Sequence, residues 1–168
     1  VDITLENPTE MISDPLLAKA IIFDNGATRL VILTVDAIAG GNLSLAGIGG
    51  LPDDFMTGVL NRIESGLGID RTNILVNASH NHRTAGQICK DVIDKAFLAV
   101  RTASENMTEV RIGAGSGQEN RIMMNRRLRL KNGREWTIRH ANPCPPDDEV
   151  TEVGPVDPEI GILRVDRV

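Results

Sequence analysis

The sequence is poor in aromatic residues, with no Tyr, three Phe and one Trp among its 168 residues. Stacking on aromatic rings is how most single-stranded nucleic acids are held, so this mode of binding is excluded. A net charge of -5 and a pI of about 5.2 likewise provide no basic footprint for a nucleic-acid backbone, or for an anionic membrane as the main partner. We therefore expect no nucleic-acid partner and a core built from aliphatic side chains and Met.

Long apolar runs and cysteines are also scarce. No run approaches the roughly 20 residues that a membrane span requires, so we expect no transmembrane segment. The chain starts at Val1 without a basic or apolar leader, and removal of a signal peptide would make it secreted or periplasmic, which leaves the compartment open. Its two cysteines, Cys89 and Cys144, do not make a disulfide scaffold, and whether they pair stays open.

The residues that are present have the balance of one globular domain over residues 1–168, with 41% hydrophobic and 24% charged residues. Two β-rich runs, 19–24 and 29–36, surround Asn25-Gly26 and predict an antiparallel hairpin. The second run is almost continuously apolar, which is typical of a strand covered on both faces.

The rest of the sequence alternates helical and extended patterns. The expected elements are a Gly-rich loop over 40–50, a helix over 55–64, a strand over 73–78, an amphipathic helix over about 88–103, a strand over 108–113, a hairpin over 125–137, a loop over 142–149 and a strand over 159–166. Hairpins and crossover helices both occur. The sequence therefore predicts an α/β fold, a single domain with a mixed β-sheet flanked by helices.

Two of the three histidines, His80 and His82, follow the 73–78 strand directly. Ligand-binding residues of α/β proteins gather at the carboxyl ends of strands, and side chains two residues apart leave an extended strand on the same face. Both rings could converge on one ion or substrate, or be loop histidines satisfied by backbone and solvent. A dinuclear site of the metallo-β-lactamase kind is disfavoured, because Thr84 and Ala85 stand where its Asp and His belong.

Several motifs occur together in one order. They are 14–20, Asp24-Asn25-Gly26, 33–36, 73–82, Asn125-Arg126-Arg127 and 156–166. In order and spacing this set resembles the N-terminal part of the neutral/alkaline, non-lysosomal ceramidase family, as a fragment or a divergent bacterial-type relative. The resemblance implies a zinc-dependent hydrolase that cleaves the amide of an N-acylsphingosine, or a related ester bond, in a small-molecule or lipid-amide substrate.

The resemblance also implies roles for three residues. His80 would bind Zn²⁺, and His82 would lie beside the metal and contact the substrate or the reacting oxygen. Arg126 would hold the polar head of the substrate or developing negative charge. These roles are chemically coherent, since zinc polarises a carbonyl and activates water while a neighbouring His relays protons.

The sequence departs from the family at several positions. Arg83-Thr84-Ala85-Gly86 replaces a Ser-Gly-Pro turn, and the family's further zinc ligands, a His, a Glu and a Tyr, have no counterpart before Val168. We therefore expect an incomplete domain. His140 is the only other imidazole and is interpreted as a surface residue. The alternative function is a non-catalytic ceramidase-like domain that acts as a ligand-binding or oligomerisation module, for instance as a homo-oligomer.

Two further positions carry weaker expectations. Asp36, at the end of a buried strand, would either orient a metal-bound His or cap the next turn. Arg127 and Arg129 belong to a basic cluster over 121–134, which is interpreted as a solvated hairpin face.

Overall fold

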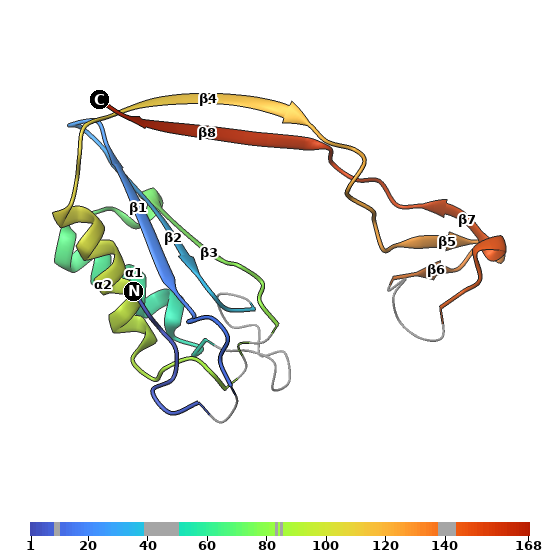
Figure 1. Ribbon diagram of the computed structural model, residues 1–168, viewed down its shortest axis with the longest axis horizontal. Helices are drawn as coiled ribbons and strands as arrows, with labels where there is room; N and C mark the ends of the chain where they lie inside the picture. The colour runs from blue at the N-terminus through green and yellow to red at the C-terminus, as the bar shows by residue number, and fades with distance from the viewer. Residues whose placement is uncertain (9–10, 39–50, 83, 85, 138–143) are drawn as a thin grey trace. The chain divides into compact units, whose positions relative to one another are not determined.

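A computed structural model describes residues 1–8, 11–38, 51–82, 84, 86–137 and 144–168 (Figure 1). The chain divides into two compact units, Val1–Met107 and Thr108–Val168, and each is described by itself. This division at Met107 was not anticipated from the sequence. The Gly-rich stretch over 40–50, part of the 142–149 loop, and His140 lie outside the described residues.

The first unit is built on a three-stranded sheet in the order β1-β2-β3. Strands β1 (Ala18–Asp24) and β2 (Arg29–Val35) form the predicted antiparallel hairpin, and β2 pairs in parallel with β3 (Ile74–Ala78). Gly26 has the positive φ of 85° that the turn requires, and the Asn25 side-chain oxygen accepts hydrogen bonds from the backbone of the turn. The expected α/β class with a mixed sheet is therefore confirmed.

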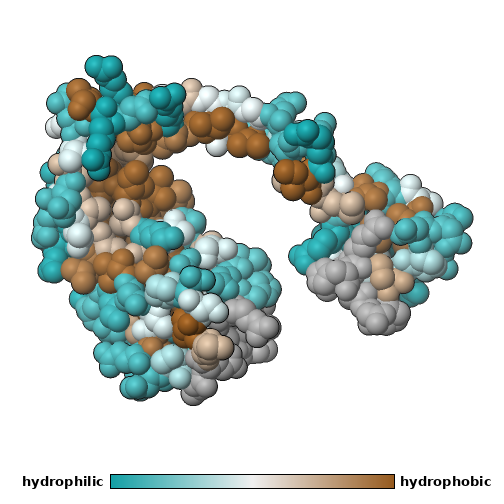
Figure 2. Space-filling view, viewed as in Figure 1, coloured by the Kyte–Doolittle hydropathy of each residue, from teal (hydrophilic) through white to brown (hydrophobic). Residues whose placement is uncertain are grey.

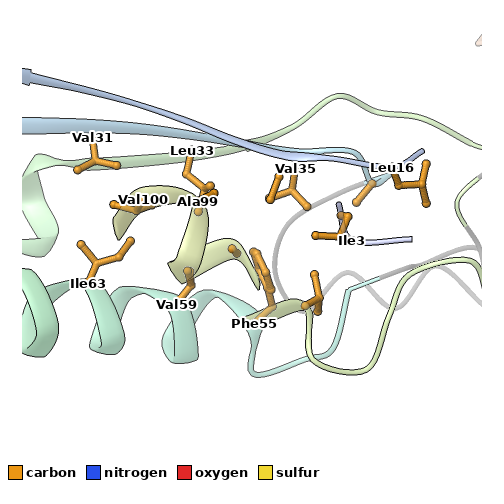
Figure 3. Close-up of a cluster of buried hydrophobic side chains, with 14 of the residues drawn as sticks. Ile3, Leu16, Val31, Leu33, Val35, Phe55, Val59, Ile63, Ala99 and Val100 are labelled. Carbon is orange, nitrogen blue, oxygen red and sulfur yellow. The ribbon is translucent and has the colours of Figure 1, made fainter. Parts of the chain in front are cut away.

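Helices α1 (Phe55–Leu67) and α2 (Val92–Glu105) pack on this sheet (Figure 1). Phe55, Val59 and Ile63 recur every four residues on α1 and are fully buried. Figure 3 shows them facing the buried side chains of β2 across the core. Among the described residues neither helix is long and apolar enough to cross a membrane.

The two helices pack closely where α1 has glycine, and this line of contact is called the seam below. A Cβ built on Gly58 would lie 2.9 Å from the Ile93 side chain, and one on Gly66 would lie 2.8 Å from the Phe97 ring. Between these contacts the Arg62 guanidinium forms an ion pair with Asp94. Residues at four-residue spacing lie on one face of a helix, so the glycines of α1 accept the large side chains of α2 at close range.

The described residues cover only one face of the sheet, whereas the apolar run of β2 predicted cover on both faces. Val31, Leu33 and Val35 alternate into the core. On the opposite face Leu30 and Leu75 are 48% and 58% exposed, and the Thr34 hydroxyl donates to the Asn77 side-chain oxygen at 3.0 Å. A continuous apolar run therefore served here as a strand with one covered face.

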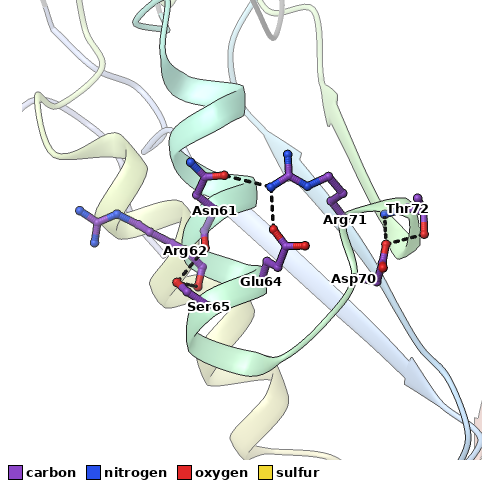
Figure 4. Close-up of polar contacts among 7 residues, drawn as sticks. All are labelled: Asn61, Arg62, Glu64, Ser65, Asp70, Arg71 and Thr72. Carbon is purple, nitrogen blue, oxygen red and sulfur yellow. Dashed lines mark hydrogen bonds and ion pairs between the residues drawn. The ribbon is translucent and has the colours of Figure 1, made fainter.

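A short polar cluster fixes the entry to β3 (Figure 4). Helix α1 ends at Gly68, which has φ 64° and donates its N–H to the Glu64 carbonyl. In the 3₁₀ turn η1 (Arg71–Asn73), the Arg71 guanidinium donates to Glu64 at 2.6 Å. The Asp70 carboxylate accepts from the backbone and hydroxyl of Thr72, and this lowers its pKa below the usual value. These bonds hold the start of the strand that leads to the histidines.

The second unit consists of two small sheets. A two-stranded ribbon pairs β4 (Val110–Gln118) with β8 (Glu159–Arg167). A three-stranded sheet has the order β6 (Glu135–Trp136), β5 (Leu128–Leu130), β7 (Val150–Val153). The 3₁₀ turn η2 (Asp147–Glu149) comes immediately before β7. The hairpin at Gly133 and the final strand are therefore confirmed, and the strand expected over 108–113 extends to Gln118. Figure 2 shows apolar side chains exposed along the ribbon, where Ile162 and Leu163 are each 52% exposed.

Candidate functional site

The histidine segment is positioned by the parallel pair β2 and β3. Beyond the last strand residues, the pairing continues through hydrogen bonds from the Ser79 N–H to the Val35 carbonyl and from the Asn81 N–H to the Ala37 carbonyl. Their lengths are 3.0 and 3.1 Å. The carboxyl ends of two parallel strands therefore lie side by side, which is the position where α/β proteins place ligand-binding residues.

His80 has a left-handed backbone conformation with φ 58°, the only such non-glycine residue in the described part of the chain. Its Nδ1 lies 2.7 Å from the carbonyl oxygen of Ile38, which follows β2. A carbonyl oxygen only accepts, so Nδ1 donates to it, and Nε2 is the ring nitrogen left to bind another group. A strained backbone conformation for a non-glycine residue is uncommon and concentrates at functional positions.

The Nε2 of His82 lies 3.1 Å from the Nε2 of His80. The ring centroids are 4.6 Å apart and the rings are nearly perpendicular, with an interplanar angle of 87°. Alternation along a strand was the reason expected for this convergence, and that reason is wrong, because β3 ends at Ala78 and His80 lies beyond it with a left-handed backbone. The left-handed residue, rather than strand geometry, brings the rings together.

The pair fits one edge of a zinc site. Imidazole nitrogens bind zinc at about 2.0–2.1 Å, so two nitrogens 3.1 Å apart are close enough to contact one ion. The Ile38 carbonyl fixes the tautomer and orientation of His80 as the outer partner of a metal-binding His does. Within the described ranges no group of three or more His, Cys, Asp or Glu side chains could hold a metal, so these two imidazoles are the donors that this part of the chain supplies.

The loop after the histidines is held by Thr84 and Gln87, two residues for which the sequence predicted no role in this loop. Thr84 is fully buried and donates its hydroxyl to the Asn81 carbonyl at 3.0 Å, and Gln87 donates its N–H to the Thr84 carbonyl. The Gln87 carbonyl accepts from Leu5 at 2.7 Å, which ties the loop to the N-terminal segment. The side-chain oxygen of Gln87 is buried without a hydrogen-bond partner. No sequence motif marks these two residues.

The other candidate residues do not join the histidine pair. The Asp36 carboxylate accepts from the Leu17 N–H at 2.9 Å, so it extends the β1–β2 pairing, and the Ile38 carbonyl takes the orienting role at His80. Arg126 is an exposed residue of the second unit, in the loop before β5. Of the three predicted site residues, the structure therefore brings His80 and His82 together, and Arg126 belongs to the other unit.

Comparison with known proteins gives a likeness in structure alone. No family model and no curated protein matches the chain. A solved structure described as a ceramidase complexed with C2 matches with a TM-score of 0.53 and 19% sequence identity. The match covers 74% of this chain and 22% of the ceramidase, so the chain spans about a fifth of the length of that protein.

Fold and site together define an α/β protein with a histidine pair at the carboxyl end of a parallel strand. The structural likeness places this fold with that of a ceramidase. It agrees in part with the resemblance seen in the sequence, because it supports a ceramidase-like fold and does not test the roles of individual residues.

Proposed function

We propose that the chain is the N-terminal part of a ceramidase-like, zinc-dependent hydrolase that cleaves the amide of an N-acylsphingosine or a related ester bond. The observation that carries this proposal is the convergence of the His80 and His82 Nε2 atoms, 3.1 Å apart, at the end of β3. The ceramidase-like fold supports it independently.

In this proposal His80 holds the metal through Nε2, while its Nδ1–H remains on the Ile38 carbonyl. Zinc, when bound, polarises the scissile carbonyl and lowers the pKa of water to about 7. With the metal on His80 and its own ring proton on Nδ1, His82 would act beside the metal as a proton relay, taking a proton at Nε2 from the attacking oxygen and returning it to the leaving amine. A second imidazole within hydrogen-bond distance of the first is suited to this task.

Arg126 is the third residue of the proposal, and it contributes a positive charge. A guanidinium is always protonated and offers several donors, so it stabilises negative charge that develops on the carbonyl oxygen or binds the polar head of the substrate. Its exposed position leaves its side chain accessible to a ligand. This role rests on the resemblance of the Asn125-Arg126 motif and is tested separately from the histidines.

The first test is zinc binding by the metal-free chain, measured by titration calorimetry. His80→Asn is the preferred variant, because Asn tolerates the left-handed backbone better than Ala does. We expect His80→Asn to weaken zinc affinity by at least about tenfold, and His82→Asn, which leaves the metal-binding Nε2 of His80 in place, to weaken it less. His140→Asn, the same change at the remaining histidine, serves as the matched control and keeps the affinity of the unaltered chain.

The second test is hydrolysis of an N-acylsphingosine by the whole protein of which this chain is the N-terminal part, measured as release of the fatty acid. We expect His80→Asn, His82→Asn and Arg126→Gln each to lower the rate by at least about a hundredfold, as removal of an acid–base or charge-stabilising group does. If the whole protein, unaltered, binds no zinc and releases no fatty acid, the proposal is overturned. That result would favour the alternative, a non-catalytic ligand-binding or oligomerisation module.

A further inference from the structure

An exposed apolar loop stands out in the second unit. Between β4 and β5, Ile122, Met123 and Met124 are 82%, 45% and 68% exposed. Single exposed apolar residues are ordinary, but three in succession form a continuous patch of the kind that marks an interaction surface. Residues 121–127 are called the apolar loop below.

The apolar loop is held in place at both ends. At its start the Glu119 N–H donates to the Pro158 carbonyl at 2.9 Å, and Arg121 donates from its backbone and its side chain to the Glu119 carboxylate. At its end the Asn125 amide donates to the Pro155 carbonyl at 2.7 Å. Both ends are therefore fixed on residues 155–158, and the three apolar side chains between them are presented to solvent by an ordered backbone.

Asn125 reaches its anchor because the facing residue has no side chain. A Cβ built on Gly154 would lie 2.8 Å from the Asn125 amide nitrogen. The Asn125 side-chain oxygen in turn accepts the Arg127 N–H at 2.9 Å. The Asn125 side chain therefore links the end of the loop to the distant Pro155 segment. The apolar loop is therefore closely packed against the chain at Gly154.

Basic residues are concentrated along the sequence around this patch. Residues 120–134 hold six Arg or Lys and no Asp or Glu. Arg121 pairs with Glu119, Arg127 lies 4.0 Å from Glu135 and Arg129 lies 3.2 Å from Glu152. Arg126 forms no ion pair with the described residues. The acidic pI does not conflict with this, because the whole excess of carboxylates lies in residues 1–107, and residues 108–168 carry ten cations and ten anions.

We propose that the apolar loop is a contact site for anionic phospholipid surfaces. Apolar side chains flanked by Arg match the composition of segments that lie in the membrane interface, with the apolar groups at the acyl boundary and the cations on headgroup phosphates. The inference rests on the proposed function, since a lipid amide is presented to a hydrolase at such a surface. It adds to that function a means of reaching the substrate.

The experiment is co-sedimentation of the full chain with vesicles of phosphatidylcholine that contain about one third phosphatidylglycerol. The test variant combines Ile122→Ser, Met123→Ser and Met124→Ser. The matched control combines Met11→Ser and Met107→Ser, two apolar residues that are 95% and 43% exposed elsewhere. We expect the test variant to lose at least about tenfold in vesicle affinity and the control variant to bind as the unaltered chain does.

Salt and the charge of the vesicle supply the second readout. Binding falls when NaCl is raised from about 0.1 to about 0.5 M, because screening shortens the reach of the cations, and vesicles of phosphatidylcholine alone bind more weakly. Arg127→Gln reduces this dependence on salt. Circular dichroism of each variant establishes that the fold is retained.

Failure of this proposal is distinguishable from failure of the proposed function. His80→Asn keeps full vesicle binding, since it alters only the histidine pair of the first unit. Absence of binding by the unaltered chain, or equal binding by the test variant, would overturn the lipid contact. A change of oligomeric state in the test variant, measured by sedimentation velocity, would also overturn it and identify the loop as a contact between protein chains.

Discussion

Cys89 shows at the residue scale how burial controls reactivity. Its side chain is 5% exposed, and burial, with the nearby Asp91 carboxylate, raises the pKa of the Cys89 thiol to about 11. Cys144 is exposed, and both thiols are free. Because the thiolate is the reactive form, we predict that a thiol reagent at pH 8 modifies Cys144 rapidly and Cys89 only as the chain unfolds. Mass spectrometry of the two peptides measures this.

The same pKa sets a pH dependence of stability. An unfolded thiol loses its proton near pH 8.5, roughly, whereas folded Cys89 keeps it up to about pH 11. Between these values the native state binds more protons, so the free energy of unfolding falls as pH rises. Cys89→Ala removes this contribution and flattens the alkaline slope in urea titrations. Equal slopes for both chains, or rapid labelling of Cys89, would show that the thiol is not buried.

The candidate site was only partly predictable at this scale. The placement of His80 and His82 after a strand could be read from the apolar run that precedes them. Their convergence depends on the φ of 58° at His80 and on the Ile38 carbonyl, and a backbone carbonyl has no signature in sequence. Gln87 and Thr84 were missed for the same reason, because their burial is set by the fold of the loop.

At the element scale, the seam between α1 and α2 allows a paired prediction. We expect Gly66→Ala to destabilise the chain by about 1 kcal/mol or more, because the new methyl group would meet the rigid Phe97 ring at 2.8 Å and overpacking exceeds the gain in helix propensity. In Gly58→Ala the contact is the end of the rotatable Ile93 side chain, so the change stays within about 0.5 kcal/mol. Urea unfolding of both variants measures the difference.

The ordering of these two variants is the informative result. Equal destabilisation would show that Ile93 yields no more readily than Phe97, and equal stabilisation would show that helix propensity rather than the seam decides the outcome. A more stable Gly66→Ala would show that the helices are not packed as closely as 2.8 Å implies. The double variant with Phe97→Leu should recover part of the loss, since a smaller side chain makes room for the methyl group.

Elements with strong periodicity were predicted well, and contacts between them were not. The strands and helices lie where hairpin signals and four-residue spacing indicated, although α2 begins at Val92 rather than near Ile88. The apolar run of β2 did not reveal that its far face lacks cover from the described residues, because composition alone does not distinguish one covered face from two. The seam at Gly58 and Gly66 depends on tertiary neighbours that no single segment contains.

At the scale of the whole molecule, the hydrophobic core belongs to one unit. Every buried residue of the main cluster lies within Val1–Met107. In the described part of Thr108–Val168 only Leu128 and Leu130 are buried apolar residues. Since apolar burial is the main driving force of folding, the first unit carries nearly all of this stabilisation.

This asymmetry predicts how the two units behave when they are produced separately. We expect residues 1–107 to unfold cooperatively on heating and residues 108–168 to remain unfolded alone, because two-stranded ribbons with little buried surface are marginal in water. Zinc affinity should be retained by residues 1–107, which contain His80 and His82, and vesicle affinity should be lost with the apolar loop. A folded 108–168 fragment would mean that apolar contacts other than Leu128 and Leu130 sustain it. Loss of zinc binding from a folded 1–107 fragment would place a required ligand after Met107, and the histidine pair would then be half of a site completed by the remainder of the polypeptide.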